Sequence, residues 1–292
     1  MKITRALWIC AFAVAVIDCL LIRAAVFESQ RRNSGTVSST AFLSSTASRY
    51  ERAQAQTILV ETDHGFGSGV VIERQGRVFV WTAAHVVKNT AKVVCHRALR
   101  YRGQKAGEMV FPGHVLVRLP GVDAALLLLE APPQALAGAQ WGDSAPLAVG
   151  TPLFHVGNLY GPAFDGSVTV GVVSQTGICP NLSNWPDNWQ VIDQATTPCA
   201  PGSSGGPIFT QDGKVIGLVV GGPGQGAAGI TCFVPVRELE RAAEEAGVTW
   251  ALWGDYCPPA KLLAEAIKIQ EKLVETEQAI DLILSPVPEE KP

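Results

Sequence analysis

The sequence predicts an all-β fold of two six-stranded antiparallel barrels, with C-terminal helices and an N-terminal hydrophobic helix. Composition is the first reason: among 292 residues there are 29 Gly and 19 Pro, with 47% hydrophobic and 17% charged residues. Such a balance is typical of a folded, turn-rich β protein. The second reason is a series of short apolar, β-branched runs, divided by Gly, Pro, Asn and Asp, that begins near residue 56.

Twelve of these runs are expected to be strands, and they fall into two groups of six. The first group covers residues 57–61, 68–73, 77–82, 91–95, 114–119 and 123–130. The second covers residues 151–157, 167–174, 189–193, 206–210, 214–221 and 229–235. Because strand follows strand without intervening helices, two packed barrels are favoured over an alternating α/β fold.

Two helices are expected after the last strand. Residues 236–247 form a helical pattern that ends at a glycine, and a second helix follows Pro258 and Pro259 and runs to about Leu284. This second helix repeats apolar positions in steps of four and three, at Leu262, Ala266, Ile269, Leu273, Thr276, Ile280 and Ile283. Such a seam suits self-association through residues 260–284, and it suits packing back on the domain equally well.

The N-terminus has the pattern of a targeting segment. Lys2 and Arg5 precede an apolar run over residues 6–22, in which Asp18 is the only charge, and residues 24–27 extend it. This indicates a signal peptide or a signal anchor over residues 1–27, with membrane contact through residues 6–27. No clear cleavage site follows, which favours the anchor. The rest of the chain is then expected outside the cytoplasm, whether membrane-anchored or secreted.

The remaining boundaries follow from composition. Residues 28–55 are expected to be a flexible linker rich in Ser and Thr, residues 56–247 the folded domain, and residues 248–292 a helical extension. The formal net charge of -3 and the pI near 6.0 give no extended positive field, so a nucleic-acid partner is not expected.

The cysteines give little support for a metal or redox centre. There are seven, none in a C-x-x-C pair, which argues against a structural zinc site and a thioredoxin-type motif. Five lie outside the hydrophobic leader, so at least one is unpaired within a monomer. We expect no metal and no organic cofactor.

The segment Gly202-Ser203-Ser204-Gly205-Gly206-Pro207 carries the clearest chemical signal. A serine between glycines can lie on a tight turn whose backbone N–H groups converge on a developing oxyanion. The N–H groups of Gly202 and Ser204 would form that oxyanion hole. The alternative for this fragment alone is an ordinary Gly/Ser turn.

A serine nucleophile needs a histidine base and a carboxylate that orients it. His85 directly follows an apolar strand in WTAAHVV, and Asp123 opens the strand AALLLL, where a charged group is costly unless paired. An Asp that only starts a strand is the alternative for Asp123. The other histidines lie in turns or strand interiors and are expected to be structural or on the surface: His64, His96, His114 and His155.

The order of these residues separates two classes of hydrolase. The serine segment also fits the G-x-S-x-G elbow of α/β-hydrolases, in which the order is Ser, acid, His. No histidine follows Ser204, whereas the order His85, Asp123, Ser204 is the chymotrypsin order.

On these motifs the chain resembles the trypsin-like serine proteases, nearest to the DegP-like (high-temperature-requirement) group. The resemblance covers residues 56–246 and rests on eight stretches in the expected order: GFGSGVVI, TAAHVV, VDAALLLLE, WGDSAPLAVGTPLFHVGNLYG, SVTVGVVS, PGSSGGP, GKVIGLVV and GITCFVPV. It implies a chymotrypsin-like fold and an endopeptidase that acts on protein or peptide substrates through an acyl-enzyme on Ser204. A catalytically silent binding or assembly module, tethered to a membrane, is the competing function.

The sequence departs from the resembled group in three ways. Ser203 replaces the usual Asn or Asp before the nucleophile, residues 178–189 look like an inserted loop, and about 45 residues after Gly247 are too few for a PDZ domain. The first departure leaves the conformation of the oxyanion loop open.

The resemblance also implies where substrate binds. The floor of the specificity pocket would lie near Pro198, and its wall on Val220, Gly221 and Gly222. Because the nearest preceding acid, Asp193, is eleven residues before Ser204, we expect cleavage after small or medium apolar residues and not after Arg or Lys. Cys199 and Cys232 flank this region, either bridged or as an unpaired buried pair.

Overall fold

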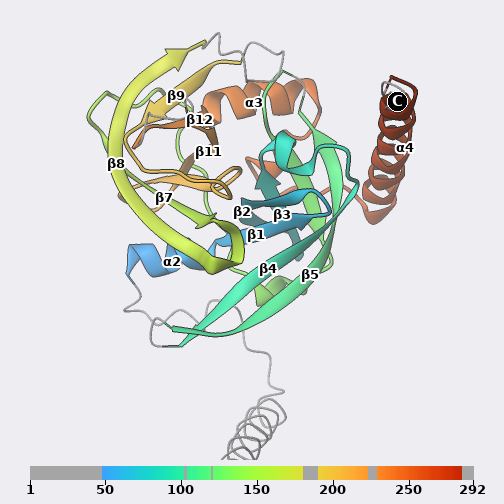
Figure 1. The fold of residues 1–292 in the computed structure, drawn as a ribbon, viewed down its shortest axis with the longest axis horizontal. Helices are drawn as coiled ribbons and strands as arrows, with labels where there is room; N and C mark the ends of the chain where they lie inside the picture. The colour runs from blue at the N-terminus through green and yellow to red at the C-terminus, as the bar shows by residue number, and fades with distance from the viewer. Residues whose placement is uncertain (1–47, 102–103, 120, 180–189, 223–228, 285–292) are drawn as a thin grey trace, which may run out of the picture. The chain divides into compact units, whose positions relative to one another are not determined.

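The computed structural model describes residues 48–101, 104–119, 121–179, 190–222 and 229–284. The first six strands close into one antiparallel barrel in the order β1-β2-β3-β6-β5-β4 (Figure 1). Their bounds are Thr57–Thr62 for β1, Gly65–Arg74 for β2, Arg77–Thr82 for β3, Lys92–Tyr101 for β4, Gln104–Arg118 for β5 and Ala125–Leu129 for β6.

The next six strands close into a second antiparallel barrel in the order β10-β11-β12-β9-β8-β7. Their bounds are Pro152–Leu159 for β7, Phe164–Ile178 for β8, Ile192–Ala195 for β9, Pro207–Thr210 for β10, Val215–Gly221 for β11 and Thr231–Pro235 for β12. The predicted two-barrel architecture is therefore confirmed.

Each barrel has an apolar interior, and a third buried cluster lies between the barrels. This third cluster joins Trp81 of β3, Phe154 of β7, Phe209 of β10 and Leu239 of the helix α3 (Val236–Glu245). The two barrels thus pack on one shared core, and the loops at their junction lie against residues of both barrels.

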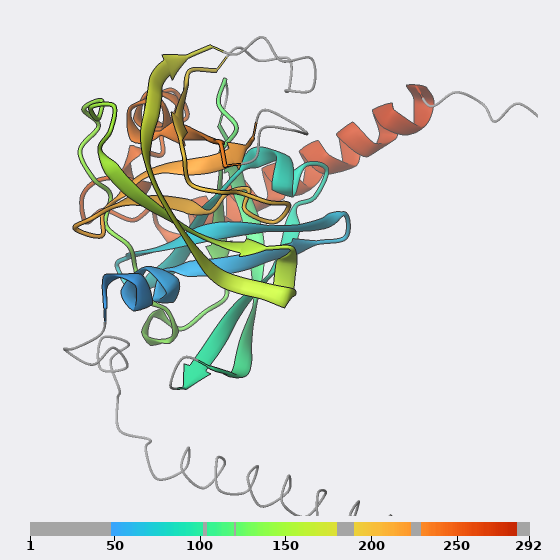
Figure 2. The same cartoon turned by 60° about the vertical axis from the view of Figure 1, so that its left-hand side comes forward.

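The β4–β5 hairpin is much longer than the apolar runs indicate. Its strands pair from Lys92 opposite His114 to Tyr101 opposite Gln104, with one shift of register between Leu99 and Arg100, and the outer part projects from the barrel (Figure 2). Residues 97–100 and 104–107 of this outer part include no buried residue, and the sequence there shows no alternation of apolar and polar side chains. Apolar periodicity therefore indicated only the half of the hairpin that lies in the barrel wall.

A helix, α2 (Arg49–Ala55), occupies residues that the sequence assigned to the flexible linker, and this part of the assignment is corrected. Ser48 caps the helix in a capping box with Glu51, and the Tyr50 ring packs edge-on against Phe154 at 5.0 Å. The other linker residues and the hydrophobic segment lie outside the described residues. In the described part of the chain, no helix is long and apolar enough to cross a membrane.

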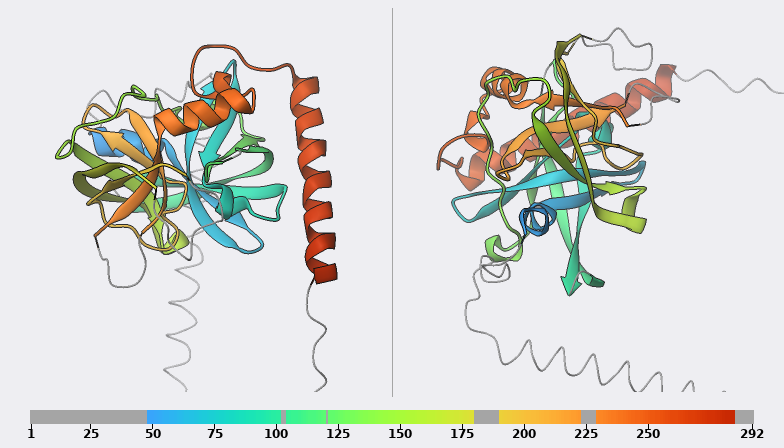
Figure 3. Two further views of the ribbon diagram at one scale, coloured as in Figure 1. Left: turned by 90° about the horizontal axis from the view of Figure 1, so that it is seen from above. Right: turned by 90° about the vertical axis from the view of Figure 1, so that its left-hand side faces the viewer.

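The C-terminal helices are found where predicted, as α3 and α4 (Ala260–Leu284). Helix α4 runs along the first barrel, where Leu263 and Val274 are buried, and Glu277 pairs with Arg118 of β5 at 3.2 Å (Figure 3). The buried face is displaced from the predicted seam, whose members Leu262, Ile269 and Leu273 are exposed.

Candidate active site

His85 and Asp123 come together at the rim of the first barrel. His85 lies in a short 3-10 helix (Ala84–Val87) just after β3, and Asp123 lies just before β6. The Asp123 carboxylate accepts the backbone N–H of His85 at 2.8 Å and contacts its ring Nδ1 at 2.5 Å. Because Asp123 is only 8% exposed, these two bonds compensate the burial of its charge. With Nδ1 bonded to Asp123, the ring presents Nε2 as a base.

Gln190 supports Asp123 from the second barrel. The backbone N–H of Asp123 donates to Gln190 Oε1 at 2.7 Å, and Gln190 is buried. Sequence reasoning did not find this residue, because an amide between an inserted loop and a short strand carries no motif.

The environment of His85 changes its basicity. Burial alone lowers the pKa of the imidazole, but the hydrogen bond to Asp123 and the negative charge of Asp123 both raise it. The net result is a pKa above the ordinary value of 6.5. The ring therefore gains a proton more readily than a free histidine does.

Ser204 lies between two tight turns. In the first, Ser203 N–H donates to Ala200 O at 2.9 Å; in the second, Gly206 N–H donates to Ser203 O at 2.9 Å. The third residue of each turn is a glycine at positive φ, Gly202 at 93° and Gly205 at 79°, as type II turns require. The two glycines thus allow the chain to double back on each side of Ser204.

The carbonyl bonds of these turns fix the direction of two N–H groups. Pro201 O accepts Tyr160 N–H at 2.6 Å, and Ser203 O accepts Gly206 N–H. In a planar trans peptide the N–H points opposite to the C=O, so the N–H groups of Gly202 and Ser204 face away from these partners. Among the described residues, neither N–H donates to a protein acceptor. Two such donors beside one serine can stabilise an oxyanion.

The two turns around Ser204, residues 200–206, are called the serine turn below. The serine turn packs against the end of β3, just before His85. A Cβ on Gly205 would lie 2.2 Å from Thr82 Oγ1 and 2.6 Å from Ala83 N, so only glycine fits there. Within the described residues, no hydrogen bond joins Ser204 Oγ to the His85 ring. Such bonds are often long in hydrolases without substrate. The fold thus brings the serine turn and the His85–Asp123 pair to one side of the barrel junction.

Ser203 closes the first turn in place of the usual Asn or Asp. Its side chain is 1% exposed, and its Oγ accepts the backbone N–H of Ala200 at 3.1 Å. A hydroxyl therefore satisfies the backbone of the loop at this position.

The expected substrate-binding residues have different settings. Pro198 is exposed, and its carbonyl accepts Thr169 Oγ1 at 3.0 Å. Val220 is 8% exposed and belongs to the core between the barrels, so its side chain is not free to line a pocket. A Cβ on Gly221 would meet nothing within 4 Å, whereas one on Gly222 would lie 3.4 Å from Cys199 Sγ.

The cysteines that the structure describes are all unbridged: Cys95, Cys179, Cys199, Cys232 and Cys257. Burial and the neighbouring Cys199 raise the pKa of Cys232 to about 11, so its thiol stays protonated. In the same part of the chain, no three His, Cys, Asp or Glu side chains are grouped so that they could hold a metal ion.

The remaining histidines have other partners or face solvent. His155 is fully buried, its Nδ1 lies 3.0 Å from Pro207 O, and burial lowers its pKa to about 4. His96 and His114 lie 2.7 and 2.8 Å from Glu61 and Glu130, respectively. His64 is exposed.

Comparison with protein families matches residues 67–218 to the trypsin-like peptidase domain. Among curated proteins, "Serine protease HtrA-like" of Staphylococcus epidermidis is 28% identical over 191 residues, covering 63% of this chain and 31% of its own. "Protease Do-like 1, chloroplastic" of Arabidopsis thaliana is 30% identical over 182 residues, covering 61% of this chain and 38% of its own. The chain thus spans about a third of the length of these relatives.

Solved structures show the same fold at lower identity. The HtrA-type protease AlgW with a tripeptide has a TM-score of 0.54 and 23% identity, covering 68% of this chain and 64% of its own. The MamO protease domain of Magnetospirillum magneticum has a TM-score of 0.55 and 18% identity, covering 66% and 97%.

Proposed function

This chain belongs to the trypsin-like peptidase family, and on that premise we propose that it is a serine endopeptidase that cleaves protein substrates through an acyl-enzyme on Ser204. The observation that carries the proposal is the combination of a buried Asp123 bonded twice to His85 with two unengaged N–H groups at Gly202 and Ser204. Base, orienting acid and oxyanion donors would then lie around one serine.

The reaction proceeds in two halves. Ser204 Oγ attacks the scissile carbonyl carbon while His85 Nε2 takes its proton, and Asp123 stabilises the imidazolium. Collapse of the tetrahedral intermediate breaks the C–N bond, and His85 gives the proton to the leaving amine. Water then attacks the ester with His85 as base, which releases the carboxylic acid and returns the proton to Ser204. In both halves the N–H groups of Gly202 and Ser204 hold the oxyanion.

Labelling with a fluorophosphonate tests this proposal directly. The wild-type chain should form a covalent adduct at Ser204, and Ser204→Ala should form none. A folded wild-type protein that shows no adduct would instead support the competing function, a silent protease fold that acts as a membrane-tethered binding or assembly module.

The same site favours small or medium apolar residues at the cleaved position. Asp193, the nearest preceding acid, is already paired with Arg237, so it is not free to meet a substrate cation. The backbone of Val220, Gly221 and Gly222 would pair with the substrate strand, while one side chain enters the region beside Pro198. A peptide library should show preference for Ala, Val or Leu. A tenfold preference for Arg or Lys would contradict this specificity.

The proposed location is outside the cytoplasm, anchored or secreted through residues 1–27, with residues 6–27 in contact with the membrane. Residues 28–47 would tether a protease domain over residues 48–247. A relative of Marinomonas sp. that is 35% identical over 152 residues has the name "Probable periplasmic serine endoprotease DegP-like". No nucleic-acid partner is proposed.

Self-association through residues 260–284 is a further part of the proposal. Leu262, Ile269 and Leu273 are 53%, 60% and 47% exposed on the side of α4 that does not contact the barrel. A second copy of this helix could cover them, with the positions spaced as in a coiled coil. Analytical ultracentrifugation of the wild type against Ile269→Lys would measure the effect.

A further inference from the structure

Ser68 connects the first barrel to the turn that carries Ser204, and the mechanism above does not use it. It lies in β2 and is completely buried. Its Oγ donates to Gly202 O at 2.7 Å, and its backbone N–H donates to Ser204 O at 2.7 Å. One residue thus holds the carbonyl groups of both residues whose N–H groups form the proposed oxyanion hole.

Asn158, near the end of β7, determines where the Ser68 hydroxyl proton points. The backbone N–H and the side-chain Nδ2 of Asn158 approach Ser68 Oγ at 2.8 and 3.1 Å. A hydroxyl has one proton and two acceptor lone pairs. Because the two donors of Asn158 occupy the acceptor positions, the Ser68 proton is directed to Gly202 O.

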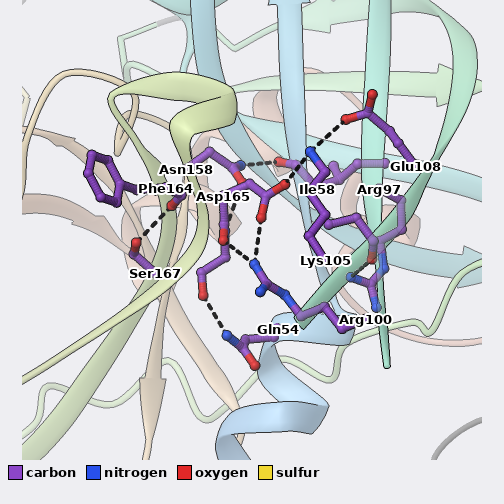
Figure 4. A network of polar contacts seen from close by, with 12 residues as sticks. Gln54, Ile58, Arg97, Arg100, Lys105, Glu108, Asn158, Phe164, Asp165 and Ser167 are labelled. Carbon is purple, nitrogen blue, oxygen red and sulfur yellow. Dashed lines mark hydrogen bonds and ion pairs between the residues drawn. The ribbon is translucent and has the colours of Figure 1, made fainter. Parts of the chain in front are cut away.

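Asn158 is itself fixed by both barrels. Its Nδ2 also donates to Ile58 O in β1 at 3.0 Å, and its Oδ1 accepts the N–H of Gly166 in β8 at 3.1 Å (Figure 4). The neighbouring Asp165 pairs with Arg100 at 2.5 Å and Lys105 at 2.9 Å, both from the β4–β5 hairpin. The side-chain amide of Asn158 therefore cannot turn without breaking its bonds to both barrels, to Ile58 O in the first and to Gly166 N–H in the second.

These bonds constrain the most flexible residue of the oxyanion loop. Tyr160 N–H holds the peptide before Gly202 through Pro201 O, and Ser68 holds the peptide after it through Gly202 O. Glycine has the widest backbone freedom of any residue. Without the Ser68 hydroxyl, the peptide between Gly202 and Ser203 keeps only the bond from Ser203 N–H to Ala200 O at 2.9 Å. Its carbonyl is then free to turn, which changes the relative direction of the N–H groups of Gly202 and Ser204.

We propose that Ser68, oriented by Asn158, is a positioning residue whose hydroxyl holds the Gly202 carbonyl and so keeps the N–H groups of Gly202 and Ser204 aimed at one oxyanion. This inference rests on the proposed function. Hydrogen bonds that form only in the transition state affect kcat more than substrate binding. The signature of Ser68 is therefore a loss in kcat with little change in KM.

The decisive variant is Ser68→Ala, which removes the hydroxyl and leaves the backbone bond to Ser204 in place. Its kcat on a peptide amide should fall by about 10- to 100-fold, less than the loss of a whole oxyanion donor, with KM within about twofold. The rate of fluorophosphonate labelling should fall with kcat. In a Ser204→Ala background, the Kd of a substrate peptide should be unchanged by Ser68→Ala.

Thr57→Val is the matched control. Thr57 is also a buried residue of the first barrel whose hydroxyl donates to a backbone carbonyl, Ala53 O at 2.9 Å, but it does not contact the serine turn. Thr57→Val should lower the free energy of unfolding, measured in urea, by about as much as Ser68→Ala does, and it should leave kcat unchanged. If Ser68→Ala does not fold, Asn158→Ala takes its place, because it removes one donor to Ser68 Oγ and should lower kcat by about threefold.

Two results would overturn the inference. The first is a folded Ser68→Ala variant whose kcat is within twofold of wild type. The second is a loss of peptide affinity on adding Ser68→Ala to Ser204→Ala that equals the loss in kcat/KM caused by Ser68→Ala alone. If the proposed function itself is wrong, the result is different, because wild type would then show no fluorophosphonate labelling. In that case, crystal structures of wild type and Ser68→Ala test the role of Ser68. The Gly202 carbonyl should change direction in Ser68→Ala, and an unchanged loop would refute its positioning role.

Discussion

Arg237 of α3 and Asp193 of β9 form a two-point ion pair, with Nη1–Oδ2 and Nη2–Oδ1 distances of 2.8 and 2.5 Å. Asp193 is only 3% exposed, and its Oδ1 also accepts the N–H of Gly177 at 2.8 Å. The pair therefore ties the second barrel to the helix that covers the shared core.

Removing one member of this pair should destabilise the protein strongly. Arg237→Met leaves a buried carboxylate without its cation and should lower the free energy of unfolding by about 3 kcal/mol. The double variant Asp193→Asn with Arg237→Met should recover part of the loss. Arg241→Met is the control on the same helix. The Arg241 side chain is half exposed, as is that of its partner Glu245, although Glu238 is only 16% exposed, so we expect a loss of less than about 1 kcal/mol. Urea unfolding measures all three, and equal losses for Arg237 and Arg241 would contradict the argument.

Changes at the three proposed catalytic residues should have large and non-additive effects on kcat. Ser204→Ala or His85→Ala should each lower kcat by about six orders of magnitude, and Asp123→Asn by roughly four. The double variant of Ser204 and His85 should be little worse than either alone. His64→Ala, at an exposed site, should leave kcat unchanged. More than a few per cent of residual activity in Ser204→Ala would show that another group is the nucleophile.

The raised pKa of His85 predicts the pH dependence. The base must be neutral to take the proton of Ser204, so kcat/KM should rise with pH, with its midpoint above the ordinary histidine value of 6.5. The folded pKa lies above the unfolded one, so protonated His85 contributes stability that is complete below pH 6.5 and lost as pH rises through the folded pKa. Asp123→Asn removes both causes of the rise, so the midpoint of its residual activity should shift to lower pH.

Truncation should show where the folded domain begins. Deletion of residues 1–47 should leave stability and activity unchanged, because it ends before the helix cap at Ser48. Deletion of residues 1–55 also removes α2, with buried Ala53 and Ala55 and the contact of Tyr50 with Phe154, and should cost about 3 kcal/mol. Urea unfolding of both fragments compares them. Equal stability would mean that α2 contributes nothing to the domain.

The sequence predicted those parts of the fold in which apolar pattern and turn chemistry agree. All twelve strands and the second C-terminal helix follow from such patterns. The three proposed catalytic residues, His85, Asp123 and Ser204, follow from their motifs and stay a prediction. Helix α2 was missed because it is short and contributes only two buried alanines and one partly buried tyrosine, which do not form a visible period. Gln190, Ser68 and Asn158 were missed as individual contributors for another reason: each contacts a group far away in sequence, such as Ser68 on Gly202 and Asn158 on Ser68.

The bonds from Ser68 to Gly202 and Ser204 also have a consequence for biosynthesis. Their partners are separated by more than 130 residues of chain, and contacts of such long range form late in folding. A growing chain that has completed only its first barrel already holds His85 and Asp123, but it lacks the serine turn. When that turn is synthesised, it gains its bonds to Ser68 only after the second barrel has docked on the first. In the protease proposed above, activity would thus arise only once both barrels are assembled, and a chain that holds the first barrel alone would be inactive.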